Sequence, residues 1–391
     1  MISGAEKAER AGAVDFRAGP SYSEAMVREI EAFDYTKGPE FSEETHPAEI
    51  TEDRMAWGYA TDILYERGYK RLPPWRVVDG ERIEYYGKIQ LQPNEDPPTV
   101  KRKDDLRHYG VIPVQQITAE DLAREQGRLS PGVLKTVHVF KIVEDNLPYF
   151  IKQASDAFKD VKGLSRSYNQ WGLEEAEHSN AAGLILQTVG GWTKEDVDRD
   201  YYVTQRNTWE PPFATDIEMD LYAMNQERNT RGNYGALAGV MREQGAPNCA
   251  LVVTRIQSDE QYHGEGYRAY AEAYARISPE RAVEAAKAAL RVAHHFRMPS
   301  LHLMRDRMAD TKQVIDTIGY NQEEIEKMLR SGLNDLSFVP KHLIDDVVGG
   351  YWKAESARVK KIIMEQLREK ARERRSARLD GPQNGNGLVP A

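Results

Sequence analysis

Apolar residues recur at the spacing of an α-helix through most of the chain after about residue 118. Short breaks separate these repeats, among them Gly190-Gly191, Gly245-Ala-Pro247 and Ser278-Pro279. Thr118-Ala-Glu-Asp opens the region with a helix-capping signature. The pattern predicts an all-α bundle with helices at about residues 132–159, 165–189, 215–243, 248–277, 279–296 and 307–332.

The first 120 or so residues follow a different pattern. Residues 1 to about 50 are acidic and contain Gly and Pro without sustained periodicity, so we expect an irregular arm there. A short helix is expected at about residues 52–67. The run Trp75 to Tyr86 carries Asp79-Gly80 between β-prone segments, which predicts a short β-hairpin. Residues 93–107 are rich in Pro and charge and are typical of a linker.

These changes of pattern divide the chain into four expected parts. Residues 1–120 form an N-terminal extension, and residues 121–345 form the helical bundle. Residues 346–378 form a helix that is strongly basic after Lys360. Residues 379–391, rich in Gly, Asn and Pro, are expected to be a disordered tail.

Acidic residues and histidines stand at repeated positions on four of the predicted helices. A lone Glu is followed 31 or 33 residues later by Glu-x-x-His. Residues three apart lie on the same side of a helix, so each Glu-x-x-His pair is able to contact one ion. Four helices that carry this order of ligands are typical of bundles that hold two metal ions in their core. The candidate metal ligands are Glu144, Glu175, His178, Glu227, Glu260 and His263.

The neighbours of these glutamates are apolar, which strengthens the interpretation. Glu144 shares a helix face with Val137 and Phe140, and Glu260 shares one with Val253 and Ile256. Carboxylates on a core-facing surface are costly unless cations compensate them. Two Fe²⁺ ions would neutralise four glutamates. The alternative is that these are polar groups satisfied in some other way. A third Glu-x-x-His, at Glu43 and His46, is followed by Pro47 in the irregular arm, and we assign it to chance.

Three further residues are candidates for roles beside the ligands. Glu174 and Asp259 each directly precede a ligand Glu. Because metal-bound histidines donate their second N–H to a carboxylate or a carbonyl, Asp259 is a candidate partner of His178, and Glu174 of His263. The alternative is that both face solvent. Thr230, one turn after Glu227, would place a hydroxyl beside the site, although helix threonines often bond their own backbone.

Composition excludes several classes of protein. The chain has 391 residues, 40% hydrophobic and 29% charged residues and a net charge of −9, which argues against a general nucleic-acid binder. Its single cysteine, Cys249, excludes an internal disulfide, an Fe–S cluster and a Cys-rich zinc site, and is expected to be a small buried side chain. No apolar run is long enough to span a membrane, and the N-terminus lacks a signal core, so a cytoplasmic location is expected.

Four motifs in this region resemble the soluble acyl-carrier-protein desaturases, including their actinobacterial members. The likeness covers about residues 130–335, and Phe296-Arg-Met-Pro299 adds to it. The four motifs are Glu144-Asp-Asn-Leu-Pro148, Trp171-Gly-Leu-Glu-Glu-Ala-Glu-His178, Gln226-Glu-Arg-Asn-Thr230 and Asp259-Glu-Gln-Tyr-His263.

The resemblance implies a ferritin-like, dimeric enzyme with a di-iron centre beside a narrow apolar acyl channel. It implies that Glu144 and His178 bind one iron, that Glu227 and His263 bind the other, and that Glu175 and Glu260 bridge the two. Dioxygen would be the cosubstrate, and a ferredoxin-type protein would supply electrons. The substrate would be an acyl group on an acyl carrier protein. Because carrier proteins are acidic, residues 101–107 and 360–375 are candidate basic docking segments. The alternative for the second segment is a solvated helix with Glu–Lys and Glu–Arg pairs.

Two departures from the family keep other functions open. Residues 1–120 do not resemble the family, and Ser179-Asn-Ala-Ala-Gly183 is more polar than a fatty-acyl tunnel requires. The alternative to a desaturase is a di-iron monooxygenase, a hydroxylase or N-oxygenase that acts on a carrier-tethered or free small molecule. A third hypothesis, an iron-storage protein, predicts many irons per chain and normally a much shorter chain.

Overall fold

A computed structural model of the chain describes the residues that surround the predicted ligands. The chain forms two compact units, Met1–Val348 and Gly349–Ala391, and only residues 349–351 of the second are described. The described residues are 23–34, 117–145, 162–204, 215–296, 316–319, 321–351, the single positions 60, 151, 154 and 314, and five short strands before residue 114.

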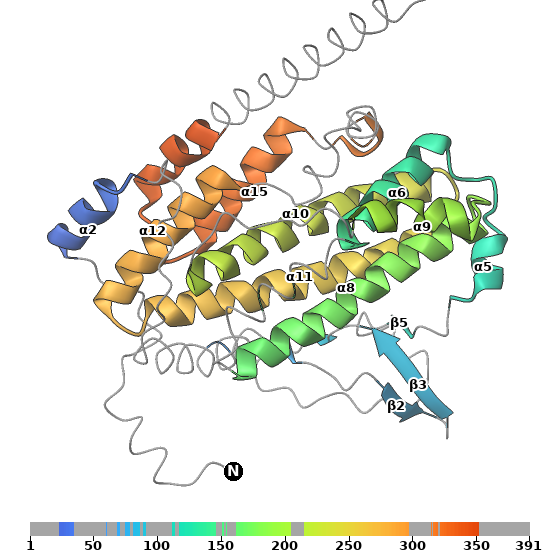
Figure 1. Ribbon diagram of the computed structural model, residues 1–391, viewed down its shortest axis with the longest axis horizontal. Helices are drawn as coiled ribbons and strands as arrows, with labels where there is room; N and C mark the ends of the chain where they lie inside the picture. The colour runs from blue at the N-terminus through green and yellow to red at the C-terminus, as the bar shows by residue number, and fades with distance from the viewer. Residues whose placement is uncertain are drawn as a thin grey trace, which may run out of the picture. The chain divides into compact units, whose positions relative to one another are not determined.

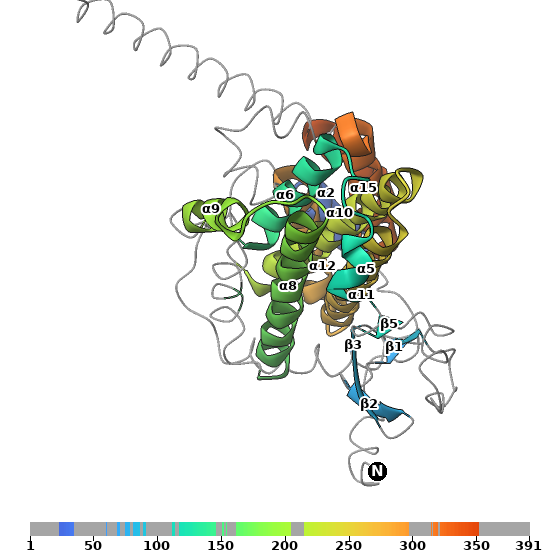
Figure 2. The same ribbon diagram turned by 90° about the vertical axis from the view of Figure 1, so that its right-hand side faces the viewer.

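The first unit is built on long helices, and the predicted all-α, ferritin-like bundle is confirmed (Figure 1). Helix α10 packs along α11, α6 packs on α8, and α8 also contacts α11. Helices α6 and α8 lie next to each other in both views (Figure 2). The bundle helices and their neighbours are α5 Ala119–Ala123, α6 Pro131–Asp145, α8 Lys162–Thr188, α9 Lys194–Thr204, α10 Asp216–Glu243, α11 Pro247–Ala275, α12 Pro279–His295 and α15 Gln322–Asp335.

The predicted hairpin is also present. Strand β2, Trp75–Val78, pairs antiparallel with β3, Glu81–Tyr86, and Val78 lies opposite Glu81. Strand β5, Ile112–Pro113, adds to β3. Two short strands, β1 Tyr69–Lys70 and β4 Ile89–Gln90, form a separate pair.

Three elements differ from the sequence prediction, and local capping explains each difference. The arm expected to be irregular contains α2, Glu24–Glu31, which Ser23 caps and which buries Ile30 against the bundle. Helix α9 was not predicted, although Thr193 caps it through the backbone N–H of Asp196. The predicted helix at 307–332 is wrong in its bounds, because Gly319 adopts a φ of 68° and Asn321 caps a new helix, α15.

Several predictions fall on residues outside the described ranges. They are the helix at 52–67 apart from Ala60, the Glu43 and His46 pair, the linker, both basic segments, and the tail at 379–391. Among the helices that the structure describes, none has the length and apolar character needed to cross a bilayer.

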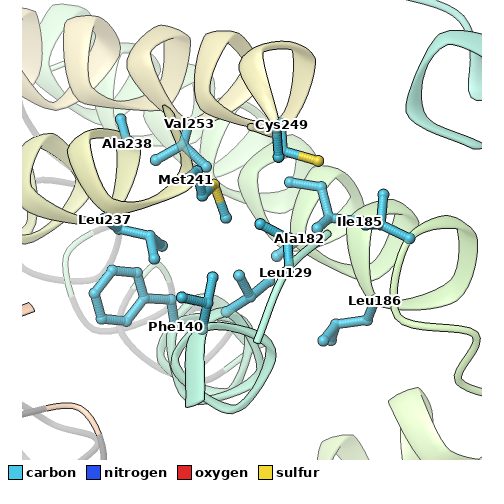
Figure 3. Packing of buried hydrophobic residues seen from close by; sticks show 14 of the residues in the cluster. Leu129, Phe140, Ala182, Ile185, Leu186, Leu237, Ala238, Met241, Cys249 and Val253 are labelled. Atoms are coloured by element: carbon cyan, nitrogen blue, oxygen red, sulfur yellow. The ribbon is translucent and has the colours of Figure 1, made fainter. Parts of the chain in front are cut away.

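An apolar cluster at one end of the bundle holds four of its helices together. Phe140 of α6, Ile185 of α8, Leu237 and Met241 of α10, and Val253 of α11 interdigitate there (Figure 3). Cys249 belongs to this cluster and is buried, as the sequence predicted, and burial raises the pKa of its thiol. The cluster fixes the spacing of the helices that carry the candidate ligands.

Helix α11 begins without a cap from its own sequence. Ala246 precedes Pro247 and offers no side-chain acceptor. The buried carboxylate of Glu125, which follows α5, accepts hydrogen bonds instead from the backbone N–H groups of Asn248, at 2.8 Å, and Cys249, at 3.0 Å. These are unpaired donors of the first helical turn, where a negative charge is favourable. A residue remote in sequence therefore anchors the helix that carries Glu260 and His263.

We expect Glu125→Ala to lower the free energy of unfolding by about 2 kcal/mol, because two buried backbone donors lose their acceptor. Chemical denaturation of the metal-free protein measures this change. Glu120→Ala, which removes an exposed glutamate of α5, is the matched control and should change stability by less than about 0.5 kcal/mol. Equal stability of the two variants would contradict the capping role.

Candidate metal centre

The structure brings the six predicted side chains together in the interior of the bundle. Glu144 comes from α6, Glu175 and His178 from α8, Glu227 from α10, and Glu260 and His263 from α11. Every one of them is buried, with at most 6% of its surface exposed. The apolar neighbours on which the prediction rested are buried as well, including Val137, Phe140, Val253 and Ile256.

Their ligand atoms form two overlapping groups of four. One group contains Glu144, Glu175, His178 and Glu260, and the other contains Glu175, Glu227, Glu260 and His263. Within each group the ligand atoms lie within 4.8 Å of one another. Glu175 and Glu260 belong to both groups. The arrangement offers space for two neighbouring cations that share two carboxylates.

Each imidazole turns its Nδ1 atom toward the carboxylates. His178 Nδ1 lies 3.0 Å from Glu175 Oε2 and 3.4 Å from Glu260 Oε1. His263 Nδ1 lies 3.0 Å from Glu175 Oε1 and 3.2 Å from Glu227 Oε2. Nδ1 is therefore the nitrogen of each ring that is placed to bind a metal.

The second nitrogen of each ring faces an outer carboxylate. His178 Nε2 lies 3.5 Å from Asp259 Oδ2, and His263 Nε2 lies 2.7 Å from Glu174 Oε2. Arg255 in turn donates to Asp259 at 3.2 Å. Carboxylates in this position fix the orientation of a ligating imidazole and make its other nitrogen a stronger donor to a metal.

Two hydroxyl groups contact the ligand carboxylates. The hydroxyl of Thr230 lies 2.7 Å from Glu260 Oε2 and 3.1 Å from the backbone oxygens of Gln226 and Glu227. It therefore contacts both a ligand carboxylate and the backbone of its own helix, the two alternatives considered from the sequence. The Tyr234 hydroxyl donates to Glu144 Oε1. Tyr234 was not singled out from the sequence. Its position seven residues after Glu227, two helical turns along the same face, was the available signal.

The polar support of α6 was not predicted from the sequence either. Lys141 and Asp145 form a buried ion pair at 2.6 Å, and Ser179 of α8 donates to the same carboxylate at 2.6 Å. Asp145 directly follows the ligand residue Glu144, and Ser179 directly follows His178. This network ties the two ligand-bearing helices together beside the site.

The charges of the site are unfavourable without cations. Burial raises the pKa of Glu144, and the nearby carboxylates Glu175 and Glu260 raise it further. The pKa of Glu227 is raised by burial and then by Glu260 and Glu175, and that of Glu175 by burial and then by Glu260. Against the cost of its burial, Glu175 and Asp259 raise the pKa of His178. Four carboxylates at this depth require protons or metal ions.

The residues fit metal ions rather than a purely internal network. Within the described part of the chain, Glu175 Oε1 and Glu260 Oε1 are buried and accept no well-aligned hydrogen bond, although each lies close to the Nδ1 atom of an imidazole. These atoms belong to the two residues that both ligand groups share. Carboxylate oxygens and imidazole nitrogens are a donor set that iron accepts readily.

Comparisons with known proteins agree with this arrangement. A sequence model of the family described as fatty acid desaturase matches residues 113–371, about two thirds of the chain and all six candidate ligands. A comparison with curated proteins gave no match. The matched region contains the four helices that supply Glu144, Glu175, Glu227 and Glu260, so the ligand-bearing core is the part that the family shares. On this match the chain belongs to the fatty acid desaturase family.

Proposed function

We propose that the protein is a non-haem di-iron oxidase that uses O₂ to desaturate an acyl group held on an acyl carrier protein, as the actinobacterial acyl-carrier-protein desaturases do. The observation that supports it most is the pair of buried ligand groups that share Glu175 and Glu260. Family membership makes the protein desaturase-like, and the metal and the carrier are parts of the proposal.

In this proposal Glu144 and His178 would hold one iron, Glu227 and His263 would hold the other, and Glu175 and Glu260 would be available to both. Four glutamates would balance the charge of two Fe²⁺ ions, which would relieve the cost of burial and the mutual repulsion that raise the pKa values of Glu144 and Glu227. The bound irons would supply the reduction of O₂ and the oxidising power needed to remove hydrogen from an unactivated C–H bond.

The protein's own residues would position and protect that chemistry. Asp259 and Glu174 hold the two imidazoles in orientation. Thr230 and Tyr234 each give a hydrogen bond to a ligand carboxylate and so restrict its rotation. Burial of all six ligands excludes water, which prevents the loss of oxidising equivalents to solvent.

The second candidate function is a di-iron monooxygenase, and one observation favours it. The helix faces two turns from the ligands carry a buried carboxyl, Asp220, and the hydroxyls of Tyr168 and Tyr267, rather than only aliphatic side chains. Polar groups at this position would suit a polar substrate. Desaturation and monooxygenation differ in their product, a double bond in the first and an inserted oxygen atom in the second.

Partners are part of the proposal as well. We propose an acyl carrier protein or a similar carrier, a ferredoxin-type electron donor, and a homodimer, each on the ground of membership in the family. Mixing the chain with a carrier protein and following their co-elution at low and high salt tests the first. Docking that survives high salt would contradict an electrostatic carrier interface.

Two measurements test the proposed function. Mass spectrometry and Mössbauer spectroscopy of the iron-loaded protein should give two coupled irons per chain. Turnover under ¹⁸O₂ should then yield an unsaturated product without label, whereas a labelled product would establish the monooxygenase. Many irons per chain, or none, would contradict both functions.

The outer carboxylates provide a finer test of the site. We expect Glu174→Ala to lower iron affinity by about tenfold to a hundredfold, because the imidazole of His263 loses its acceptor. Glu174→Gln should lose less, since its amide oxygen still accepts. Anaerobic titration of Fe²⁺ measures both variants. Glu177→Ala, which removes an exposed glutamate of α8, is the control. Iron affinity in Glu174→Ala equal to that of the control would contradict the supporting role.

A further inference from the structure

Two helical turns from the candidate metal centre, α10 carries a buried carboxyl that has no partner among the residues that the structure describes. Asp220 has no exposed surface, and within the described part of the chain neither of its carboxyl oxygens has a hydrogen-bond partner. A buried polar group in this state costs free energy that folding alone does not recover. Such a group in a native structure points to a ligand or to a functional role.

Helical spacing places Asp220 in one layer with two aromatic residues, Tyr168 and Tyr267. Asp220 precedes Glu227 by seven residues, Tyr168 precedes Glu175 by seven, and Tyr267 follows Glu260 by seven. Since α11 contacts α8 and runs back along α10, these offsets lead toward the same end of the bundle. The layer lies two turns, or about 10 Å, from the ligands.

The aromatic rings of this layer contact one another and reach the ligands. The ring centroids of Tyr168 and Tyr267 are 5.3 Å apart, and Trp171 lies 5.9 Å from Tyr168 and 6.4 Å from Tyr267. Trp171 also meets His263 edge-on at 6.5 Å. Burial raises the pKa of the Tyr168 hydroxyl, and the charge of Asp220 raises it further, as expected for groups of one layer. The layer is thus continuous with the metal centre.

We propose that Asp220, with Tyr168, Trp171 and Tyr267, recognises a cationic amino group on the substrate, at a distance of two helical turns from the atoms to be oxidised. A carboxylate beside several aromatic faces is the combination that binds an ammonium group by charge and by cation–π attraction. Burial raises the pKa of Asp220, and the charge of Asp216, one turn before it on α10, raises it further. A bound ammonium group would supply the positive charge that stabilises the carboxylate form. A purely aliphatic acyl chain would leave the carboxyl unpaired.

This inference rests on the proposed function, because it names the substrate class of the same site. It specifies an alkyl or acyl group that carries an amine, with the reacting carbon about 10 Å from the nitrogen, roughly the length of an eight-carbon chain. The amine would occupy the layer, and the chain would extend along Trp171 toward the metal ligands.

The test compares octylamine, octanol and octanoate, which share a chain length and differ in the head group. Calorimetric titration into the full-length, iron-loaded protein should show octylamine binding at least about tenfold more tightly than either of the others. Equal binding of octylamine and octanol, tighter binding of octanoate, or failure of octylamine to bind would each overturn the proposal. This comparison uses the wild-type chain alone, so it holds even if a variant fails to fold.

Two variants of α10 locate the effect. Asp220→Asn keeps the shape of the side chain and removes its charge, and should reduce the preference for octylamine at least about tenfold. Glu218→Gln is the matched control, because Glu218 is buried on the same helix but is paired with Arg291 of α12. It should keep the preference. A preference that survives in Asp220→Asn would overturn the proposal.

Failure of this inference is distinguishable from failure of the proposed function. If the protein holds no iron but still prefers octylamine through Asp220, only the di-iron assignment fails. If it holds two irons per chain and shows no preference for the amine, only the substrate inference fails.

Discussion

Glu175→Ala is expected to abolish O₂-dependent turnover and to lower the bound iron well below that of the wild type, while the helical content stays the same. Glu175 belongs to both ligand groups, so its removal weakens both metal sites at once. Loss of an outer carboxylate typically costs ten- to a hundredfold in metal affinity, and loss of a shared ligand should exceed about a hundredfold. Iron analysis, circular dichroism and oxygen uptake measure the three quantities.

The metal-free form of this variant separates loss of metal from loss of fold. Burial and Glu260 raise the pKa of Glu175, which offsets part of the stabilisation that its hydrogen bond to His178 Nδ1 provides without metal. Metal-free Glu175→Ala should therefore lose no more than about 2 kcal/mol of unfolding free energy and keep its helical content. His263→Ala should also lose iron and turnover, and in addition lose stability, because Glu174 is left without the imidazole.

Glu177→Ala serves as the control for both variants, since Glu177 lies on the same helix between the two ligands and points to solvent. It should keep full iron and full turnover. Full iron loading and activity in either Glu175→Ala or His263→Ala would show that the metal is elsewhere.

The bundle and its six central side chains were predictable because both depend on periodicity. A carboxylate such as Glu227 stands on a face with Ala223, Met224 and Ala238, and all three are buried in the structure. Helical spacing alone puts that face in the core. The order of the four ligand motifs then requires the four helices to meet.

The elements that were not predicted depend on single capping residues or on contacts between helices. Helix α9 is short and mixed in character, and its only strong signal is Thr193 with Asp196, the same Thr-x-x-Asp pattern that begins α5 at Thr118. Helix α2 is held by Ile30 and by an ion pair of Glu29 with Lys287 of α12, at 2.6 Å. No local pattern in the arm contains that partner.

The sequence failed to reveal some residues near the site for the same reason, because their roles depend on contacts between helices. Tyr234 is indistinguishable from a core aromatic until α6 places Glu144 beside its hydroxyl. Asp220 reads as an ordinary polar position in the segment Glu218-Met-Asp-Leu until packing removes every exposed atom from its surface. Sequence spacing identifies which residues share a face, but only the tertiary packing shows which polar groups find a partner.

Removal of iron is expected to lower stability and to change the way in which stability depends on pH. Binding of metal to the folded state alone stabilises it by about 4 kcal/mol when free metal exceeds the dissociation constant a thousandfold. A chelator should therefore lower the melting temperature by several degrees. Chemical denaturation under anaerobic conditions, with and without Fe²⁺, measures the difference.

The pH dependence of the metal-free protein follows from the direction of the pKa shifts. The pKa values of Glu144, Glu175 and Glu227 are raised in the folded state, mainly by burial, and carboxylates with such shifts hold protons that the unfolded chain has released. These carboxyl groups contribute fully to stability at a pH below about 4.3, the pKa of a glutamate in the unfolded chain. That contribution is lost as the pH rises through the higher pKa values of the folded protein. Burial opposes the charged form of His178, but Glu175 raises its pKa above the usual value. Its contribution to stability is therefore also lost as the pH rises above about 6.5.

Metal-free protein should therefore lose stability steadily as the pH rises from about 5 to 8. In the iron-loaded protein the metal replaces these protons, and its affinity grows with pH because the ligands must be deprotonated. The loaded protein should then keep or gain stability over the same range, so the two curves diverge. Glu175→Gln, which cannot titrate, should flatten the metal-free curve. Parallel curves for the loaded and metal-free proteins would mean that iron does not compete with protons at these carboxylates, and the assignment of Glu144, Glu175 and Glu227 as ligands would fail.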